Sequence, residues 1–394
     1  MSIITQGIRS AMSVPLISKK NLLGVLHIDS TKKSSQFNSD NLELLSGIAS
    51  QAAVAIENAK LIKTIEKEAE TRQHLQRYLS PELVEQVVNK QIDLEIGGQL
   101  KKATILFSDL RGFTKMTDTI GAEAVVKILN DYFSRMVDII FVNGGVLDKF
   151  IGDAIMAIWG MPIQNENDSL RAVEAAIKMQ KELFYFNITQ RRQKRDILKM
   201  GIGINLGDVV VGNMGSEKRM EYTVIGPPVN LASRVESLTS KNQILISDNV
   251  YNEVKDITST IELAPTRVKG INRPIQIYNV IGICNEQQES INFLPILLDD
   301  IKDPQIKYEG IIEIINPDKI IFNLEPDVEI EIGQETNFSL DIPKVTPDIP
   351  VKILCKDIEL SSHREDEFLK IEADIIELPE EVEKFLNNIF GKEE

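Results

Sequence analysis

The longest regular pattern in the sequence is an alternation of apolar strands with amphipathic helices, which extends from Ala103 to about Ile283. Elements that alternate in this way bury a sheet against helices, so the pattern predicts an α/β (α+β) domain with boundaries near residues 99 and 284. The chain has 394 residues, which is long for one hydrophobic core and suits two or three domains. The segments on either side of the alternating region should therefore form further units.

Residues 1–60 read as two apolar strands joined by a turn and followed by a helix, which Ser39 and Asp40 would begin. Two strands and one helix are too few to close a hydrophobic core. The segment resembles the last third of a GAF domain, in the runs Val14–Leu16 and Gly24–Leu26. The earlier strands and the ligand pocket of that family have no counterpart in the sequence. We therefore expect further sequence upstream, and no ligand bound by this segment alone.

Residues 45–98 are predicted to form a helical linker and connector that leads to the α/β domain. Apolar residues recur at its start in steps of three and four, the spacing of an a/d seam. They are Leu45, Ile48, Ala52, Ala55, Ala59 and Ile62. Such a seam can pair with the same helix of a second copy and support a homodimer. Alternatively, the helix packs alone on the GAF-like strands, and the sequence leaves both arrangements open.

Residues 285–394 are acidic and rich in strands, which predicts a small separate β domain. The predicted elements are strands at Tyr308–Ile315, Lys319–Leu324, Val351–Leu360 and Phe368–Ile376, and a closing helix at Pro379–Phe390. They weakly resemble a PilZ-type barrel, which would imply binding of cyclic diguanylate. The arginine pair with which such barrels grip the dinucleotide has no clear counterpart here. We therefore favour a structural or protein-contact role.

The charge and the cysteine content exclude several classes of function. A net charge of −15 argues against a nucleic-acid-binding protein, which needs a basic surface to displace counterions from phosphates. The two cysteines, Cys284 and Cys355, suit neither a disulfide framework nor a zinc cluster. No stretch approaches the roughly 20 apolar residues of a membrane span, and no signal-peptide pattern follows Met1. We expect a cytoplasmic protein with no membrane span and no nucleic-acid partner.

Two aspartates occupy positions where a metal could be held. Asp109 follows the apolar strand Ala103–Phe107 and precedes a turn at Gly112, a suitable place for a cation and a phosphate. Asp153 lies in a turn within the run Gly144–Trp159, and a hairpin there can bring it beside Asp109. Two such carboxylates could bind a pair of divalent ions about 3.5 to 4 Å apart. Each aspartate also has a simpler interpretation, as a helix cap or as part of a Gly-Asp turn.

A further helix is predicted to begin at Pro227 and Pro228, because proline favours the first helical turn. Asn230 and Arg234 are four residues apart and therefore share one face of this helix. An amide and a guanidinium on one face could hold a ribose and a charged phosphate. Alternatively, the two side chains are simply solvated.

Taken in their order and spacing, these motifs resemble the class III nucleotidyl cyclases, and the resemblance covers nearly all of residues 103–283. It implies a ferredoxin-like catalytic domain with two Mg²⁺ or Mn²⁺ ions in each active site. The metal ligands would be Asp109, Asp153 and the backbone of Leu110. The backbone near the triphosphate would be that of Gly112, Phe113 and Thr114.

The same resemblance implies roles for side chains that bind the nucleotide. The pair that selects the base matches Lys149 and Thr223. The amide that orients the ribose matches Asn230, the transition-state arginine matches Arg234, and a phosphate-binding lysine matches Lys269. The resemblance further implies a homodimer with shared sites, in which the aspartates of one copy face the nucleotide-binding residues of the other. A single copy would then be inert.

Base selection can also be argued from the side chains. The ammonium of Lys149 only donates, so it suits the N1 acceptor of adenine and opposes the N1–H of guanine. Thr223 can accept from the adenine amino group, although its hydroxyl can also donate. Because a polar mismatch in a desolvated site costs more than a missing methylene, Lys149 should make ATP the substrate. The alternatives are a guanylate cyclase and a catalytically silent scaffold, although no expected site residue is missing.

Overall fold

The computed structural model describes most of the chain. The described residues are 7–19, 21–32, 37–75, 84, 98–113, 116–117, 121–216, 219–271, 273–284, 290–300, 307–315, 318–341, 350–364 and 366–390. Of the predicted site residues, Thr114 lies outside this set, and so does most of the predicted connector between residues 76 and 97. The chain forms two compact units, Met1–Arg77 and Tyr78–Glu394, and each is described by itself.

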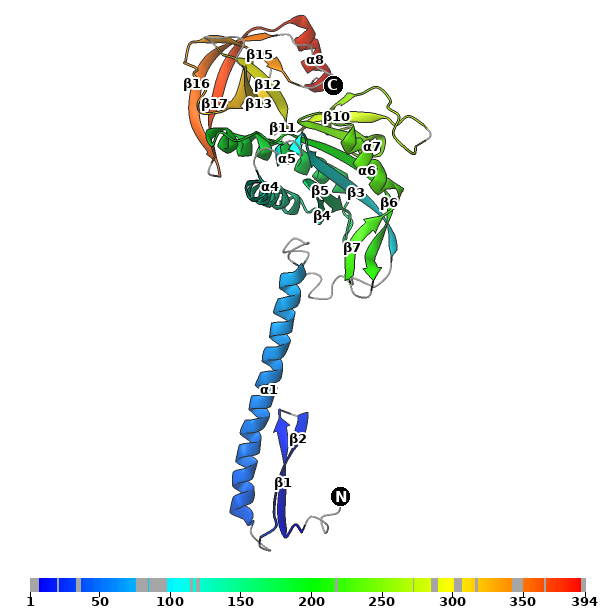
Figure 1. Ribbon diagram of the computed structural model, residues 1–394, viewed down its shortest axis with the longest axis vertical. Coiled ribbons are helices and arrows are strands. Elements are labelled where there is room, and N and C mark those ends of the chain that lie inside the picture. Colours follow the sequence, from blue (N-terminus) through cyan, green and yellow to red (C-terminus); the bar gives the residue numbers. More distant parts are fainter. Residues whose placement is uncertain are drawn as a thin grey trace. The chain divides into compact units, whose positions relative to one another are not determined.

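The first unit consists of a two-stranded antiparallel ribbon and one long helix (Figure 1). Its elements are β1 (Ser10–Ser18), β2 (Asn21–Ser30) and α1 (Ser39–Leu75). Their order is the one that the sequence predicted, and the helix begins at Ser39 as expected.

The apolar residues of α1 divide between two faces. Leu45 and Ala49 pack against Val14 of the ribbon and form the buried core of this unit. Leu45 belongs to the predicted a/d seam, so the first part of the helix packs on the strands. Ile48 and Ile62 of the same seam are exposed. Pairing of this helix with a second copy therefore stays a prediction.

The second unit contains a nine-stranded sheet whose main path runs β11-β10-β8-β6-β3-β5-β4. β7 pairs with β6 and β9 pairs with β10. β6 and β8 are parallel, whereas the other pairs are antiparallel. The strands are β3 (Gln99–Leu110), β4 (Val146–Ile151), β5 (Ala154–Trp159), β6 (Met200–Ser216), β7 (Arg219–Ile225), β8 (Gln243–Ser247), β9 (Thr258–Glu262), β10 (Ile277–Cys284) and β11 (Ser290–Asn292). The helices are α4 (Ala122–Val142), α5 (Asp168–Arg192), α6 (Pro227–Ser237) and α7 (Asp248–Val254).

Helices cover both faces of this sheet, because successive residues of β8 pack against different helices. Ile244 and Ile246 belong to the main core, together with residues of α4, α5 and α7. Leu245, between them, packs instead with Val235 of α6. Because neighbouring residues of a strand point to opposite faces, α6 covers one face and the other three helices cover the second. The predicted mixed α/β fold class is confirmed.

The main core contains several large, fully buried side chains. Trp159 of β5 and Tyr132 of α4 have no exposed area, and the indole N–H of Trp159 donates to the carbonyl of Asn143 at 2.9 Å. Full burial of one large apolar side chain contributes about 1.5–3 kcal/mol to folding. These residues hold α4 against the strands that carry the predicted site.

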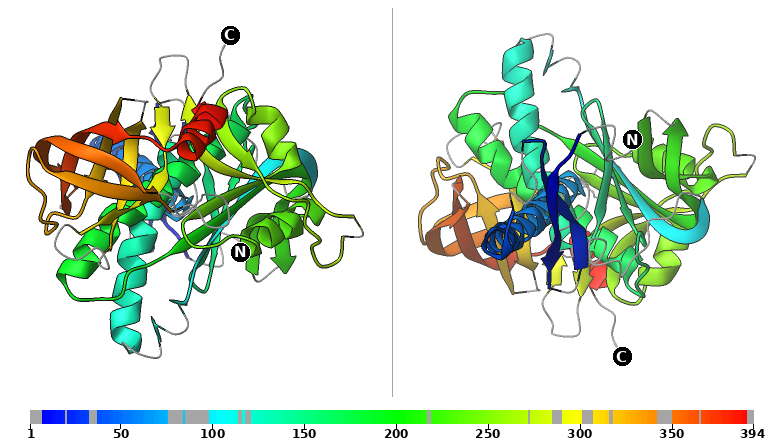
Figure 2. Two further views of the ribbon diagram at one scale, coloured as in Figure 1. Left: turned by 90° about the horizontal axis from the view of Figure 1, so that it is seen from above. Right: turned by 90° about the horizontal axis from the view of Figure 1, so that it is seen from below.

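Beyond the sheet the chain forms a closed barrel in the order β12-β13-β14-β17-β16-β15, coloured yellow to red in Figure 2. Its elements are β12 (Leu294–Asp299), β13 (Lys307–Ile315), β14 (Lys319–Leu324), β15 (Glu335–Leu340), β16 (Val351–His363), β17 (Asp366–Glu377) and the helix α8 (Glu380–Phe390). Buried residues such as Phe322 and Phe338 give it a core of its own. The predicted strands and closing helix are present, whereas β12 and β15 were not predicted.

The barrel is packed against the sheet domain and belongs to the same compact unit. β17 lies beside α5 (Figure 1). Phe368 of β17 joins the main core. Arg135 of α4 donates to Asp366 at 2.5 Å and to Glu182 of α5 at 3.1 Å. A ring nitrogen of His363 lies 2.6 Å from Glu182. Ion pairs and a shared core therefore join the barrel to α4 and α5.

Among the helices that the structure describes, none combines the length of a membrane span with sufficient apolar character.

Candidate functional site

The two predicted metal-binding aspartates lie close together at the end of the central strands. Asp109 is near the end of β3, and Asp153 follows Gly152, whose φ of 66° forms the turn between β4 and β5. β3 pairs with β5 up to Ser108 and Ile155, so the two carboxylates meet. Burial raises the pKa of Asp153, and the neighbouring charge of Asp109 raises it further. A cation bound between them would relieve this repulsion.

The ligands at this pair are oxygen atoms, which suits a hard divalent cation such as Mg²⁺ or Mn²⁺. In the part of the chain that the structure describes, no three His, Cys, Asp or Glu side chains are grouped to hold a metal. Two carboxylates would therefore need further oxygen ligands, from the backbone of Leu110 or from the phosphates of a nucleotide. The residues present fit such a metal.

Arg111 belongs to this site, although the sequence analysis did not single it out. Its Nη1 donates to Oδ2 of Asp109 at 3.1 Å, and its Nη2 donates to Oε1 of Glu236 at 2.6 Å. Glu236 is on α6, two residues after Arg234. Burial raises the pKa of Glu236, and the Arg111 guanidinium partly opposes that rise. Arg111 thus ties the first aspartate to the helix of the predicted transition-state arginine.

The turn after Asp109 lies beside an open cavity. Gly112 adopts a φ of 76°, a backbone conformation that favours glycine. Gly112 and Phe113 line a cavity of about 350 Å³ together with the segment from Asp196 to Lys199. The expectation that the backbone of Gly112 and Phe113 lies near the triphosphate stays a prediction.

Lys149 and Thr223, the predicted base-selecting pair, are also brought together. Nζ of Lys149 donates to Glu221 of β7 at 2.9 Å and lies 3.5 Å from the carboxylate of Asp148. Thr223 is on the same strand as Glu221. Its hydroxyl and the Lys149 ammonium both act to lower the pKa of the Asp148 carboxylate. Burial alone would lower the pKa of Lys149, but the carboxylates of Glu221 and Asp148 outweigh burial and raise it. Lys149 is therefore held as a cation, which is the form that only donates.

The helix α6 starts at Pro227 as predicted and lies almost directly on the backbone of β6. A Cβ atom at Gly203 would lie 2.1 Å from the backbone nitrogen of Glu236, and one at Gly207 would lie 2.6 Å from Pro228. Only glycine permits this approach. The close packing fixes the height of α6 above the sheet, and with it the place of Asn230, which is exposed.

Arg234 lies one turn further along α6 and is half-buried. The loop that contains Lys269 passes beside it, because a Cβ atom at Gly270 would lie 3.2 Å from the Arg234 guanidinium. Gly270 also has a φ of 75°, so its backbone conformation and the close approach of Arg234 both favour glycine there. Lys269 itself is exposed. The backbone segments that carry Arg234 and Lys269 are therefore neighbours. A polyphosphate site would need two such cations.

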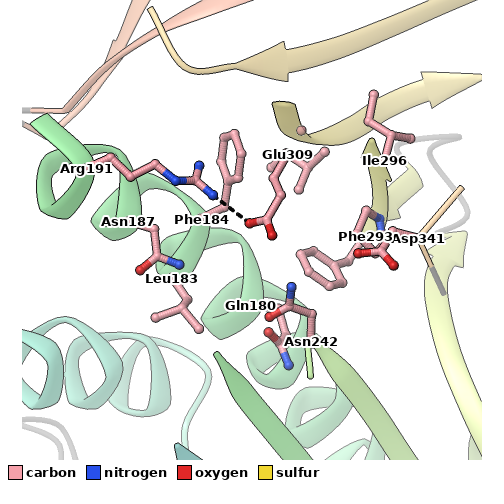
Figure 3. A pocket seen from close by; sticks show the side chains of 13 residues that line it. Gln180, Leu183, Phe184, Asn187, Arg191, Asn242, Phe293, Ile296, Glu309 and Asp341 are labelled. Carbon is pink, nitrogen blue, oxygen red and sulfur yellow. Dashed lines mark hydrogen bonds and ion pairs between the residues drawn. The ribbon is translucent and has the colours of Figure 1, made fainter. Parts of the chain in front are cut away.

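A different cavity lies at the joint between α5 and the barrel (Figure 3). It is lined by Gln180 and Arg191 of α5 and by Glu309 of β13, and Arg191 donates to Glu309 at 2.7 Å. Its volume of about 30 Å³ has room for about two water molecules. None of the predicted site residues lines it, and it is too small for a nucleotide.

Comparison with known proteins gives two family matches. Residues 97–282 match the profile described as "Adenylate and Guanylate cyclase catalytic domain", and residues 5–58 match that of a GAF domain. The cyclase and GAF resemblances stated from the sequence are confirmed, whereas the PilZ resemblance stays a prediction. An adenylate cyclase from Anabaena cylindrica is 33% identical over 240 residues, which are 58% of this chain and 45% of that protein. The chain spans less than half the length of the curated relatives that it matches.

Two solved structures are similar over the same region. The adenylyl cyclase CyaB from P. aeruginosa is 40% identical, and the guanylyl cyclase Cya2 is 42% identical. The matches cover 47% and 48% of this chain and 96% of each of those chains, with TM-scores of 0.47.

Proposed function

We propose that this chain, whose residues 97–282 belong to the adenylate and guanylate cyclase family, converts ATP to 3′,5′-cyclic AMP and pyrophosphate. The observation that carries the choice of ATP is the pair Lys149 and Thr223. Lys149 is held as a cation by two carboxylates and can only donate, which suits N1 of adenine and opposes N1–H of guanine. Thr223 can accept from the adenine amino group.

The reaction requires the ribose 3′-hydroxyl to attack the α-phosphorus in line while pyrophosphate leaves, so the protein's task is positioning and charge stabilisation. Asn230 would orient the ribose. Arg234 would stabilise the charge that develops on the α-phosphoryl oxygens, and Lys269 would bind a terminal phosphate. The turn at Gly112 and Phe113 would lie along the triphosphate.

Members of this family depend on metal, and the carboxylate pair fits one. Asp109, Asp153 and the backbone of Leu110 would hold Mg²⁺ or Mn²⁺, two ions in each site. Bound metal supplies Lewis-acid stabilisation of the reacting phosphates and helps to ionise the attacking hydroxyl. Arg111, which donates to Asp109, would keep that carboxylate oriented.

The active sites would be shared across a homodimer, with the aspartates of one copy facing the nucleotide-binding residues of the other. This division is what the resemblance to the class III cyclases implies. The exposed face of α1, with Ile48 and Ile62, offers a second contact between copies. The barrel would serve as a structural or protein-contact module, and binding of cyclic diguanylate there is the less favoured alternative.

A direct assay tests this function. The purified chain is incubated with ATP or GTP in the presence of Mg²⁺ or Mn²⁺, and the products are identified by mass. We expect cyclic AMP and pyrophosphate from ATP, with metal required and little cyclic GMP. Cyclic GMP as the main product would favour a guanylate cyclase, and no cyclic product with either metal would favour a silent scaffold.

A further inference from the structure

The strand that carries Lys149 is irregular directly before that residue. β4 pairs with β5 at Leu147 and Ala157 and again at Lys149 and Met156, so Asp148 is an extra residue in a β-bulge. Bulges re-aim side chains and are frequent beside active sites. Here the carboxylate of Asp148 points inward, and its side chain is 0% exposed.

This buried carboxylate has few partners. Neither oxygen of Asp148 has a hydrogen bond of good geometry within the described residues. The ammonium of Lys149 lies 3.5 Å from Oδ2. Burial raises the pKa of Asp148, while the hydroxyl of Thr223 and the charge of Lys149 oppose that rise. A buried carboxylate without strong partners costs stability, so its position beside both base-selecting residues points to a role in their function.

The hydroxyl of Thr223 needs such a neighbour in order to discriminate between bases. A hydroxyl carries one proton and two lone pairs, so it can accept from the amino group of adenine or donate to the carbonyl of guanine. An ionised carboxylate can only accept. When the Thr223 proton is directed at Asp148, only lone pairs remain for the base. The hydroxyl can then accept from the amino group of adenine but cannot donate to the carbonyl of guanine.

We propose that Asp148 is a positioning residue for base selection, which fixes Thr223 as an acceptor and holds Lys149 beside it. The proposal rests on the proposed cyclase function and extends it from two selecting side chains to three. It also explains how a threonine can discriminate between bases although its hydroxyl is able to donate.

The test is a double-mutant cycle on the full chain. Asp148→Asn keeps the shape of the side chain, but its amide can donate to Thr223 and release the hydroxyl proton towards the base. The measured quantity is kcat/KM with ATP divided by kcat/KM with GTP. We expect Asp148→Asn to lower this ratio about tenfold, the worth of roughly one hydrogen bond. In a Thr223→Val background, which lacks the hydroxyl, Asp148→Asn should leave the ratio unchanged.

Asp168→Asn is the matched control. Asp168 is another buried aspartate, at the start of α5, where it accepts from the backbone of Asn165 and from Arg171. Its replacement should lower the midpoint of thermal unfolding and leave the nucleotide ratio unchanged. If Asp148→Asn does not fold, Asp148→Ala is measured in the same two backgrounds.

The outcomes separate this proposal from the function on which it rests. An unchanged ratio in the Asp148 variant overturns the positioning role. An equal fall with and without the Thr223 hydroxyl also overturns it, because Asp148 would then act by another route. A wild-type chain that makes no cyclic nucleotide would instead remove the proposed function.

Discussion

Arg234 is the residue to which we assign stabilisation of charge in the proposed transition state. It is half-buried on α6, its guanidinium lies against Gly270, and Lys269 follows on the same loop. Because the charge on the α-phosphoryl oxygens grows only as the reaction proceeds, a group aimed at them contributes more to the transition state than to ATP binding.

Replacement of Arg234 should therefore act on turnover. We expect Arg234→Ala to lower kcat by about two to three orders of magnitude with little change in KM for ATP. Steady-state kinetics with ATP check this. The control is Arg192→Ala. Arg192 is 34% exposed and pairs with Glu367 at 3.1 Å, so its removal should leave both constants near wild type. A rise in KM at constant kcat would contradict the assigned role.

At the scale of elements, α5 is the contact between the catalytic domain and the barrel. Glu182 of α5 is 4% exposed and faces two guanidinium groups and an imidazole ring: Arg135 at 3.1 Å, Arg364 at 3.3 Å and the His363 ring at 2.6 Å. Burial alone would raise the pKa of Glu182, but His363, Arg364 and Arg135 outweigh it and lower the pKa below its usual value. A carboxylate with a lowered folded-state pKa stabilises the fold above its unfolded pKa and loses that effect as pH falls through the folded value.

Glu182 should accordingly make the joint sensitive to acid. At neutral pH, Glu182→Gln should unfold at a lower temperature, because it removes the buried counter-charge of Arg135 and Arg364, a loss of about 3 kcal/mol. The difference from wild type should shrink as pH falls below about 4.5 and Glu182 becomes protonated. Thermal unfolding at several pH values measures this. Glu174→Gln, which affects the half-buried pair with Lys178 within one helix, should change little. A difference independent of pH would contradict the sign of the pKa shift.

Part of this architecture could be predicted from the sequence and part could not. Asp109 and Asp153 were placed together because a strand end and a glycine turn have local signatures. The bulge at Asp148 has no such signature, since an extra residue is recognised only against its partner strand. The link from Arg111 to Glu236 joins residues 125 positions apart, which no local pattern reports. Leu45 fitted both the a/d seam and the ribbon core, and only the packing showed which one it occupies.

At the scale of the whole molecule, the proposed dimer divides each site between two copies. Asp109→Ala and Arg234→Ala homodimers should each be nearly inactive, since every site lacks one essential group. When the two variants are mixed and allowed to exchange subunits, each mixed dimer gains one intact site, and activity should reach roughly a quarter of the wild-type value. Cyclic AMP production by the mixture measures this. A mixture as inactive as its parents would show that each chain builds a complete site alone.

The close contact between α6 and the backbone of β6 predicts how variants of this chain should complement one another. A side chain at Gly207 would push against Pro228 and displace the start of the helix, while the carboxylates of Asp109 and Asp153 stay on their own strands. A Gly207→Val allele should then fall in the complementation group of Arg234→Ala and be rescued by Asp109→Ala. Gly207, which has no side chain, would thus behave in complementation tests like a residue of the nucleotide-binding half of the site.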